Sequence, residues 1–414
     1  MADIEFELLS APDASFPAVF KESKVICSHH DLGGIPSDLS QLYERMAATE
    51  ADVLKLAFQV DEITECLKIF ELLERARLEG RRMIAIAMGE AGIMTRILGA
   101  SRGSYLTYGP LDAESATAPG QLSARELREV YRVHQINHHT EVTGLIGNPV
   151  KHSFSPQIHN AAFAAKGINA VYLPLEVSKL ERFMRLMADP RTREMDWSLR
   201  GLSVTAPHKR EVMLHLDWIE DAAQAIGAVN TIVVQDERLH GYNTDATAAL
   251  APLREEIELK HARVAVIGAG GAARALLWSL REACARVTVF ARDIERARET
   301  AEQFEADYAR LDGASFGEFE VVINATPLGM RGKSEFETPA LAAQLRGAKV
   351  AYDLVYNPRE TRFMREALTA NCQAIGGLEM LIAQAAEQFK LWTGTDAPLE
   401  VMRVAGEKAV MSHE

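Results

Sequence analysis

The chain has 414 residues, 48% hydrophobic and 25% charged, which is enough length for two or three globular domains with sizeable cores. Its formal net charge of −13 argues against wholesale nucleic-acid binding and gives no attraction to anionic membranes. Its apolar runs are too short to span a bilayer. Four widely spaced cysteines without a CxxC pair suggest neither a zinc site nor a disulfide framework. With an acidic N-terminus that lacks a signal-peptide pattern, they predict a cytoplasmic location.

Residues 1–125 alternate short apolar runs with amphipathic stretches. SKVICS, DVLKLAF and RMIAIAM predict buried parallel strands, because both of their faces are apolar. SDLSQLYERMAA and DEITECLKIFELLERARLEG predict the helices between them. Lys55 lies inside one apolar strand, where desolvation would favour an uncharged amine that can attack a ketone. The alternative is a lysine that snorkels out at the strand end.

Residues 124–140 predict a helix that runs into a linker. His134 and His138 would then be one turn apart, with His139 beside them, a spacing that can bind zinc. No acidic partner follows in the metalloprotease pattern, so a solvated linker face is the preferred interpretation. A new strand follows over residues 143–147, and AVYLPLEV, RGLSVTA and TIVVQ continue the β/α alternation to about residue 245.

Polar side chains gather at the strand ends of this middle block. Ser153 and Ser155 occupy alternate positions of a segment expected to be extended, so both hydroxyls could donate to one carboxylate. Thr205 and Lys209 follow a strand, at the edge where open α/β sheets bind ligands. Each residue has a structural alternative: the serines could form a turn or a helix cap, Asn230 a turn, and Asp245 an N-cap.

A glycine turn opens the third block. In RVAVIGAGGAAR, Gly268, Gly270 and Gly271 lie between a strand and a helix, which suits a pyrophosphate at the helix N-terminus. The alternative is simply a tight turn. After the next strand, Arg292 and Arg296 suit a 2′-phosphate and favour NADP. Asp293 could repel that phosphate or cap the following helix, and Arg296 could lie on a solvated face.

Eight motifs, in order, make the chain from about residue 143 to its end resemble the shikimate dehydrogenase family, nearest its plant-type and fused bacterial members. They are GLIGNPVKHSFSP, LSVTAPHK, GAVNT, GYNTD, VIGAGGAAR, INATPLGM, DLVYNP and GGLEMLIAQAAEQF. The resemblance implies NADPH-dependent reduction of 3-dehydroshikimate to shikimate. It departs from the family at Asp293, where threonine is usual.

The resemblance also implies roles for individual residues. Lys209 and Asp245 would be the catalytic pair. The residues implied in substrate binding are Ser153, Ser155, Thr205, Asn230, Tyr356 and Gln384. Those implied in cofactor binding are Gly268, Gly270, Gly271, Arg292, Arg296, Thr326, Met330 and Gly377.

The first block resembles type I 3-dehydroquinate dehydratase, a (β/α)₈ barrel, through ICSHHD, ADVLKLA, MGEAGIMTR and ATAPGQL. Lys55 would form the imine, His30 would be the general acid/base, and Arg96 and Gln121 would contact the substrate. Threonine replaces the family's serine at positions 95 and 117. DIEFEL matches the fourth barrel strand, so the first three βα units lack a counterpart. A truncated start, a partner chain or a remnant would explain this, and we expect little dehydratase activity.

The expected fold class is α/β: a partial barrel, a substrate domain and a Rossmann domain. The expected boundaries are residues 1–125 for the barrel, 126–142 for a linker, 143–246 plus helices 376–410 for the substrate domain, and 247–375 for the Rossmann domain. The active site would lie in the cleft between the last two, and the assembly would be a monomer or homodimer. The rival hypotheses are a quinate/shikimate dehydrogenase using NAD, a fully bifunctional enzyme, and a catalytically silent regulator.

Overall fold

A computed structural model describes residues 1–10, 23–111, 120–332 and 334–412. The chain divides into two compact units. The first comprises Met1–Pro156, Gly167–His208 and Val234–Arg238, and the second comprises Gln157–Lys166, Lys209–Val233 and Leu239–Glu414. Within the described ranges, no helix combines the length and the apolar character needed to cross a bilayer.

The first unit begins with a parallel sheet of order β1-β2-β3-β4. Its strands are β1 (Ala2–Glu5), β2 (Val25–Asp31), β3 (Val53–Gln59) and β4 (Met83–Met88). Its helices are α1 (Phe6–Leu9), α2 (Leu39–Ala47), α3 (Cys66–Leu78) and α4 (Ile93–Leu98). The predicted βα repeat is confirmed. The expected strand DIEFEL is shorter than predicted, because the chain turns into α1 at Phe6.

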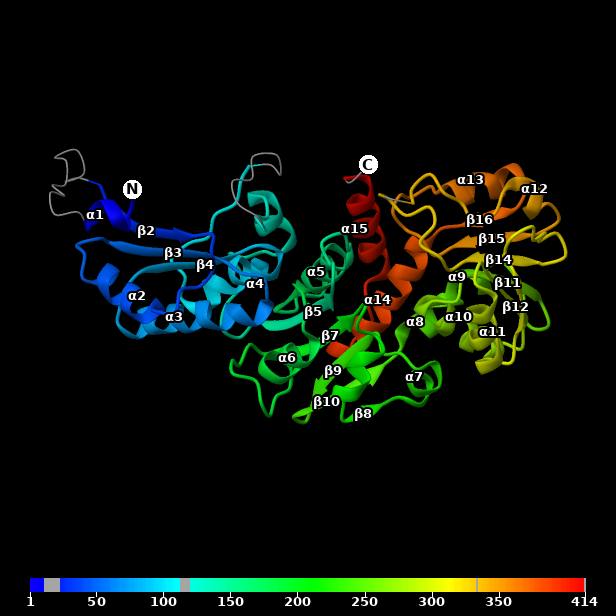
Figure 1. Cartoon of the computed structure of the whole chain (residues 1–414), viewed down its shortest axis with the longest axis horizontal. Coiled ribbons are helices and arrows are strands. Elements are labelled where there is room, and N and C mark those ends of the chain that lie inside the picture. Colours follow the sequence, from blue (N-terminus) through cyan, green and yellow to red (C-terminus); the bar gives the residue numbers. More distant parts are fainter. Residues whose placement is uncertain (11–22, 112–119, 333, 413–414) are drawn as a thin grey trace. The chain divides into compact units, whose positions relative to one another are not determined.

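One face of this sheet carries an apolar cluster against which Leu106 and Tyr108 pack. The cluster consists of Ile26, Val53, Ala57, Ile84, Ile86 and Met88. Side chains alternate along a strand, so Ser28, His30 and Lys55 share this face. Helices α2 and α3 run alongside the sheet (Figure 1). Ser28, His30 and Lys55 therefore lie on the same face of this four-stranded sheet as the apolar cluster.

A second group of parallel strands completes the first unit, in the order β6-β5-β7. They are β5 (Glu141–Gly147), β6 (Ala170–Glu176) and β7 (Leu199–Val204), accompanied by α6 (Leu180–Phe183) and the start of α5 (Ser155–Lys166). All six residues of α4 are buried, and α4 contacts both β4 and β6. Buried Glu62 also accepts a hydrogen bond from Ser178 at 2.8 Å. The N-terminal sheet and these strands thus form one packed body.

The helix expected to run into a linker within residues 124–140 is confirmed, and its helical part covers residues 124–130. A short helical stretch ends in a π-helical turn over Glu126–Val130, and turns follow. His134 and His138 lie in these turns, so the expected one-turn spacing on a helix is wrong. The short 3-10 and π segments of the described chain are Ile63–Glu65, Glu90–Gly92, Gly99–Arg102, Glu126–Val130, Met184–Ala188 and Glu211–His215.

The second unit contains a six-stranded parallel sheet of order β13-β12-β11-β14-β15-β16. The strands are β11 (Arg263–Ile267), β12 (Arg286–Ala291), β13 (Asp307–Arg310), β14 (Val321–Asn324), β15 (Val350–Asp353) and β16 (Gln373–Ile375). The helices between them are α10 (Gly271–Glu282), α11 (Ile294–Gln303), α12 (Ala342–Leu345) and α13 (Arg362–Thr369). This strand order is that of the doubly wound dinucleotide-binding fold, and it confirms the predicted Rossmann domain.

Helices cover both faces of this sheet (Figure 1). Val264 and Val266 of β11 face one core, which includes residues of α10 and α11. Ala265 and Ile267 face the other, which includes residues of α12 and α13. Successive apolar residues of one strand are therefore buried on opposite sides, the reason its sequence is a continuous apolar run.

The other elements of the second unit include those that carry the candidate site. These elements are α7 (Asp221–Ile226), β8 (Trp218–Ile219), α8 (Thr244–Ala249), α9 (Ala251–Arg254), α14 (Gly377–Thr393), α15 (Leu399–Met411) and most of β9 (Thr231–Gln235) and β10 (Arg238–Tyr242). Helix α14 packs on α8. It is also tied to β9, because Trp392 donates to the carbonyl of Ile232 at 3.0 Å. The C-terminal chain thus returns to the site.

Candidate active site

A lysine and an aspartate form an ion pair in the second unit. Lys209 Nζ lies 2.6 Å from Asp245 Oδ2, and the side chains keep 25% and 12% of their exposure. The backbone of Lys209 is fixed by a 2.8 Å hydrogen bond from Val229 N to its carbonyl. Asp245 is in the first turn of α8, which is capped by Asn243 rather than by Asp245. The N-cap alternative for Asp245 is therefore excluded.

Asn230 holds the second oxygen of that carboxylate. Its Nδ2 donates to Asp245 Oδ1 at 2.8 Å and lies 3.0 Å from Thr244 Oγ1. Its Oδ1 accepts from Thr244 N and from Thr231 Oγ1, each at 2.8 Å. With 2% exposure, Asn230 is enclosed by protein groups. It orients Asp245, and contact with a ring hydroxyl stays a prediction.

Helix α14 brings Gln384 to the same cluster. Its Oε1 lies 3.4 Å from Asn230 Nδ2, and Gln388 one turn on donates to Thr231 Oγ1 at 2.9 Å. These contacts unite residues separated by more than 130 positions in the chain. The structure thus brings four predicted site residues together: Lys209, Asn230, Asp245 and Gln384.

The glycine turn joins β11 to α10, and its three glycines differ in kind. Gly268 has φ +120°, and a Cβ added there would lie 2.8 Å from the carbonyl oxygen of Ala325. The fold itself therefore requires glycine at that position. A Cβ added at Gly270 or Gly271 would meet nothing within 4 Å. The space in front of these two residues is open, as a backbone that receives a ligand requires.

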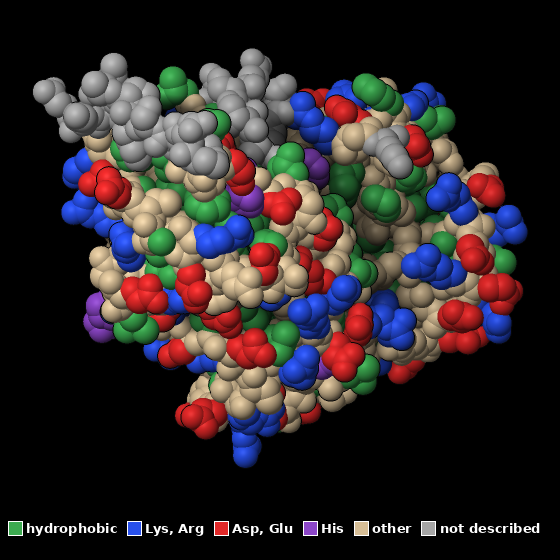
Figure 2. Space-filling model, turned by 60° about the vertical axis from the view of Figure 1, so that its left-hand side comes forward, with side chains coloured by type: hydrophobic (Ala, Val, Ile, Leu, Met, Phe, Trp, Pro, Cys, Tyr) green, Lys and Arg blue, Asp and Glu red, His purple; other side chains and the backbone are tan. Residues whose placement is uncertain are grey.

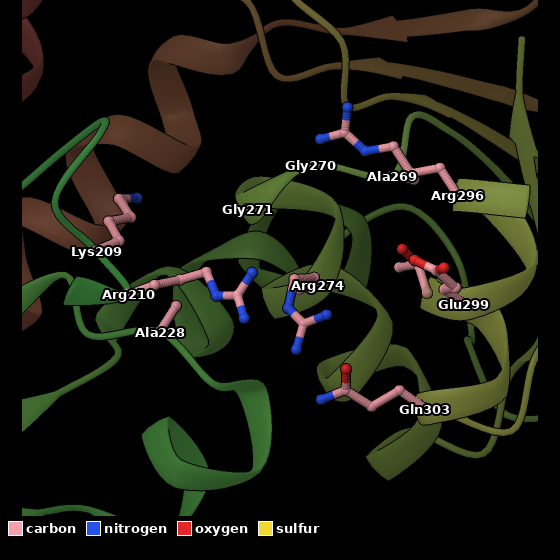
Figure 3. Close-up of a pocket in the computed structure, with 11 residues that line it drawn as sticks. Lys209, Arg210, Ala228, Ala269, Gly270, Gly271, Arg274, Arg296, Glu299 and Gln303 are labelled. Carbon is pink, nitrogen blue, oxygen red and sulfur yellow. The ribbon is translucent and has the colours of Figure 1, made fainter. Parts of the chain in front are cut away.

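A pocket of about 390 Å³ lies beside this turn (Figure 3). It is lined by Lys209, Arg210, Ala228, Ala269, Gly270, Gly271, Arg274, Arg296, Glu299, Thr300 and Gln303. Four cationic side chains face one carboxylate in this lining, although the chain as a whole carries −13. On the face shown in Figure 2, by contrast, acidic and basic side chains are intermixed. The pocket is therefore suited to an anionic ligand.

The loop after β12 settles the question of Asp293. Its carboxylate caps α11 by accepting from the backbone N–H groups of Glu295 at 3.1 Å and Arg296 at 3.3 Å. Arg296 lines the pocket, whereas Arg292, also exposed, is not part of that lining. The carboxylate of Asp293 is thus engaged by the helix terminus.

The other residues implied in cofactor binding follow β14 and β16, and Tyr356, which is implied in substrate binding, follows β15. Thr326 Oγ1 donates to Asn324 Oδ1 at 2.6 Å, and Met330 is 46% exposed. Gly377 begins α14, where an added Cβ would lie 2.4 Å from the carbonyl of Leu354. Tyr356 is half-buried, and burial raises the pKa of its hydroxyl. The binding roles of these residues stay predictions.

A buried polar network that we did not predict supports these loops. Asp353 accepts from Asn324 Nδ2 at 2.9 Å, from Val355 N at 3.0 Å and from Thr361 Oγ1 at 2.5 Å. Burial raises the pKa of Asp353 to about 6, despite these donors. The signal available in the sequence was an acidic residue that directly follows an apolar strand, in DLVYNP.

The two serines and Thr205 lie in the first unit. Ser155 is the first residue of α5, and its N–H donates to Ser153 Oγ at 3.2 Å. The expectation of an extended segment is wrong here, because the chain forms a turn that leads into a helix. Thr205 follows β7, with its N–H bonded to the carbonyl of Ile146 at 2.9 Å. Binding of a carboxylate by Ser153 and Ser155 does not require side chains that alternate along an extended segment, and this role stays a prediction.

Polar side chains of the N-terminal sheet also contact one another. Lys55 Nζ lies 2.7 Å from Asp3 Oδ2 and 4.8 Å from the ring centre of Tyr108. His30 Nδ1 lies 2.7 Å from Glu5 Oε1. For Asp3, burial acts to raise the pKa, but hydrogen bonds from Lys55 and Ser28 outweigh it and hold that pKa below its ordinary value.

Arg96 is buried on α4, and burial lowers the pKa of its guanidinium to about 10. Gln121 is half-buried, and Thr95 is buried with its hydroxyl bonded to the carbonyl of Gly92 at 2.8 Å. Thr117 and most of the ATAPGQL motif lie outside the described residues. Catalytic or substrate-binding roles for this group stay predictions.

The strand order, the glycine turn and a lysine–aspartate pair whose lysine lines the neighbouring pocket define a dehydrogenase of the Rossmann class. Family models agree in chain order. Residues 1–138 match type I 3-dehydroquinase, and 145–232 match the shikimate dehydrogenase substrate binding domain. Residues 250–330 match shikimate/quinate 5-dehydrogenase, and 377–405 match the shikimate 5′-dehydrogenase C-terminal domain. The chain belongs to the shikimate dehydrogenase family, fused to a type I 3-dehydroquinase segment.

Named relatives support this assignment. The chloroplastic bifunctional 3-dehydroquinate dehydratase/shikimate dehydrogenase of Arabidopsis thaliana is 35% identical over 95% of this chain and 67% of its own length. Shikimate dehydrogenase (NADP⁺) of Methanocaldococcus jannaschii is 42% identical over 65% of this chain and 97% of its own. The crystal structure of the Thermus thermophilus enzyme with NADP(H) and shikimate is similar with a TM-score of 0.59 at 37% identity. It covers 65% of this chain and 99% of that one.

Proposed function

We propose that this chain catalyses the NADP-dependent interconversion of 3-dehydroshikimate and shikimate. One observation carries the proposal: Lys209, whose ammonium lies 2.6 Å from Asp245, is a lining residue of the pocket beside the glycine turn. An ammonium in that place can supply a proton to an oxygen on which negative charge develops. Relatives of up to 42% identity bear the name shikimate dehydrogenase (NADP⁺).

The reaction divides between the cofactor and the chain. When bound, the reduced dinucleotide supplies the hydride that adds to the C3 carbonyl carbon. Lys209 gives a proton to the resulting alkoxide, so the ketone becomes an alcohol and the lysine is left neutral until it takes up a proton from solvent. In the reverse direction the neutral amine accepts the proton of the alcohol. The amine is thus the general acid of reduction and the general base of oxidation.

Asp245 and Asn230 position Lys209 for proton transfer. The carboxylate holds the ammonium, and Asn230 fixes the other carboxylate oxygen at 2.8 Å. Because Asn230 is buried and bonded through both ends of its amide, the carboxylate cannot easily turn away. The proton donor is therefore held in one orientation before substrate arrives.

The residues present fit a phosphorylated dinucleotide. Open space in front of Gly270 and Gly271 admits a pyrophosphate at the start of α10. The cationic lining favours additional phosphate charge, which supports NADP over NAD. The runner-up, a quinate/shikimate dehydrogenase that uses NAD, predicts equal or better kinetics with NAD and quinate. Kinetics with both acids and both cofactors separate the two.

We propose that Ser153 and Ser155 bind the substrate carboxylate. Ser153 and buried Ser155 lie at the N-terminus of α5. The N-terminus of a helix favours negative charge. Thr205, Asn230, Tyr356 and Gln384 would contact the ring hydroxyls. The substrate class is a small polyhydroxylated ring acid.

The two kinds of glycine give a direct test of the dinucleotide site. Gly271→Ala should leave the free energy of unfolding nearly unchanged, because its new methyl group meets open space. It should raise the KM for the dinucleotide at least about tenfold, since the methyl group would meet the ligand. Gly268→Ala should instead cost about 1–3 kcal/mol of stability, because alanine is strained at φ +120°. Urea unfolding and steady-state kinetics measure both. An unchanged KM for the dinucleotide in Gly271→Ala would contradict a ligand site at Gly271.

For the dehydratase-like segment we predict little conversion of 3-dehydroquinate. Lys55 forms an ion pair with Asp3 at 2.7 Å, and His30 lies 2.7 Å from Glu5, so both groups already contact a carboxylate within the chain. An assay for the dehydrated product checks this, with Lys68→Ala as a control for loss of an exposed lysine. Conversion that is lost in Lys55→Ala but kept in Lys68→Ala would contradict the prediction and favour a bifunctional enzyme.

We also propose a cytoplasmic location and a monomer or homodimer. The cysteines at positions 27, 66, 284 and 372 are free, and all but Cys284 are buried, as suits a reducing compartment. Microscopy of a tagged chain tests the location, and light scattering tests the mass.

A further inference from the structure

Two arginines stand close together in the pocket without a carboxylate partner. Figure 3 shows the guanidinium groups of Arg210 and Arg274 near each other, on the side of the pocket away from Arg296. Among the described residues, neither of the two forms an ion pair with Asp or Glu. Elsewhere in this acidic chain arginines find carboxylates readily: Arg298 on nearby α11 lies 2.6 Å from Glu295.

Arg274 is held in place by two contacts. Its Nε donates to the carbonyl of Ile226 at 3.1 Å, and its guanidinium carbon lies 5.5 Å from the ring centre of Phe304. Gly227 makes room for it, because a Cβ there would lie 3.1 Å from Arg274 Nη2. Arg274 is thus a rigid donor whose position does not depend on a ligand.

The positive charges of Arg210 and Arg274 repel each other. Burial, and then the charge of Arg210, hold the pKa of Arg274 below its ordinary value. Two cations that face each other without an anion repel, and an oxyanion between them would relieve the repulsion and accept several N–H donors at once. Glu299 is the one acidic residue of the lining, and it lies on α11 with Arg296.

We propose that Arg210 and Arg274 form a phosphate subsite of the nucleotide pocket, separate from Arg296. The inference rests on the proposed dinucleotide-dependent function. The phosphate comes either from the 2′-phosphomonoester or from the 5′-phosphate at the pyrophosphate position. Arg210 is exposed and forms no ion pair with Asp or Glu among the residues described, so its positive charge is available to a ligand. Arg274 would also bind the phosphate while its Nε donates to the carbonyl of Ile226.

Binding of nucleotide fragments tests the subsite without turnover. Isothermal titration calorimetry would compare 2′,5′-ADP with 5′-AMP, which differ only in the 2′-phosphate, on the full-length chain. Arg210→Gln should weaken one or both at least about tenfold, the scale of a lost charge-assisted hydrogen bond. Weakening of 2′,5′-ADP alone identifies the 2′-phosphate as the ligand group, and equal weakening of both identifies the 5′-phosphate.

Three further variants keep the test decisive. Arg254→Gln removes an exposed arginine that does not line the pocket and should bind both fragments as the unaltered chain does. Arg274→Lys keeps the charge but loses the planar fork, so it should weaken binding less than Arg210→Gln combined with Arg274→Gln. Unchanged affinity for both fragments in Arg210→Gln and in the double variant would overturn the proposal. Fragment binding without any oxidation of shikimate would contradict the proposed function alone.

Discussion

Replacing Lys209 by alanine should lower kcat for reduction of 3-dehydroshikimate by roughly 10²–10⁴-fold, the usual contribution of a positioned general acid. The KM for the substrate should change much less, since the ammonium is engaged by Asp245 at 2.6 Å and acts mainly when charge develops on the ketone oxygen. Steady-state kinetics in both directions measure this split.

The control for Lys209→Ala is Lys349→Ala. Lys349 also pairs with a carboxylate, Glu320 at 2.9 Å, but its side chain is 66% exposed and lies outside the pocket. This variant should keep the kinetic constants of the unaltered chain. If Lys209→Ala raised KM and lowered kcat by similar factors, Lys209 would be a binding residue, and the proton would have to come from another group.

Asp353 should make the fold less stable as the pH rises. An acid whose pKa is raised from 3.8 to about 6 in the folded state retains its proton there while the unfolded chain loses it. Its contribution is fully present below the unfolded value and is lost as the pH rises through the folded one. The loss is on the order of 3 kcal/mol, from about two pKa units at 1.36 kcal/mol each.

The measurement is urea unfolding of the unaltered chain and of Asp353→Asn at pH 4 and pH 7. Asparagine can still accept from Asn324 and Val355 and can donate to Thr361, so the network survives without a charge. The variant should match the unaltered chain at the lower pH and exceed it in stability at the higher one. Exposed Asp307→Asn should show no such change. Asp353→Asn that is less stable at pH 7 would mean that hydrogen bonds to the carboxylate outweigh its burial.

Most strands of the parallel sheets could be predicted because their sequences are continuous apolar runs. Two of the edge strands, β8 and β13, could not. Strand β13 shows three exposed residues and one half-buried residue, and β8 has two residues, so neither carries a hydrophobic pattern. The C-terminal helical stretch could be predicted, but its division could not be placed. It breaks at Gly394, which adopts a left-handed conformation, and α15 begins after Pro398.

Within the candidate site, residue types were easier to predict than local conformation. Lys209, Asn230 and Asp245 stood out as polar residues near strand ends, and the structure brings them together. Ser153 and Ser155 were expected on an extended segment, but hydroxyl side chains also favour turns and helix starts, and that preference prevailed.

Other residues carried no distinctive signal. Arg210 follows Lys209 directly, and Arg274 lies in the first turn of an amphipathic helix, where solvated arginines are common. Their importance depends on how closely α7 and α10 approach each other in the fold. No local sequence pattern predicts that distance. The N-cap role of Asp293 was one of two open alternatives, and the direction of one carboxylate decides it.

The proposed reaction is tested most directly in a spectrophotometer, by adding 3-dehydroshikimate to the purified chain with NADPH. We expect oxidation of the dinucleotide with one shikimate formed per NADPH consumed, and little oxidation in Lys209→Ala. Binding of the ring acid without any oxidation of NADPH would show instead that the chain is a regulator with a catalytically silent site.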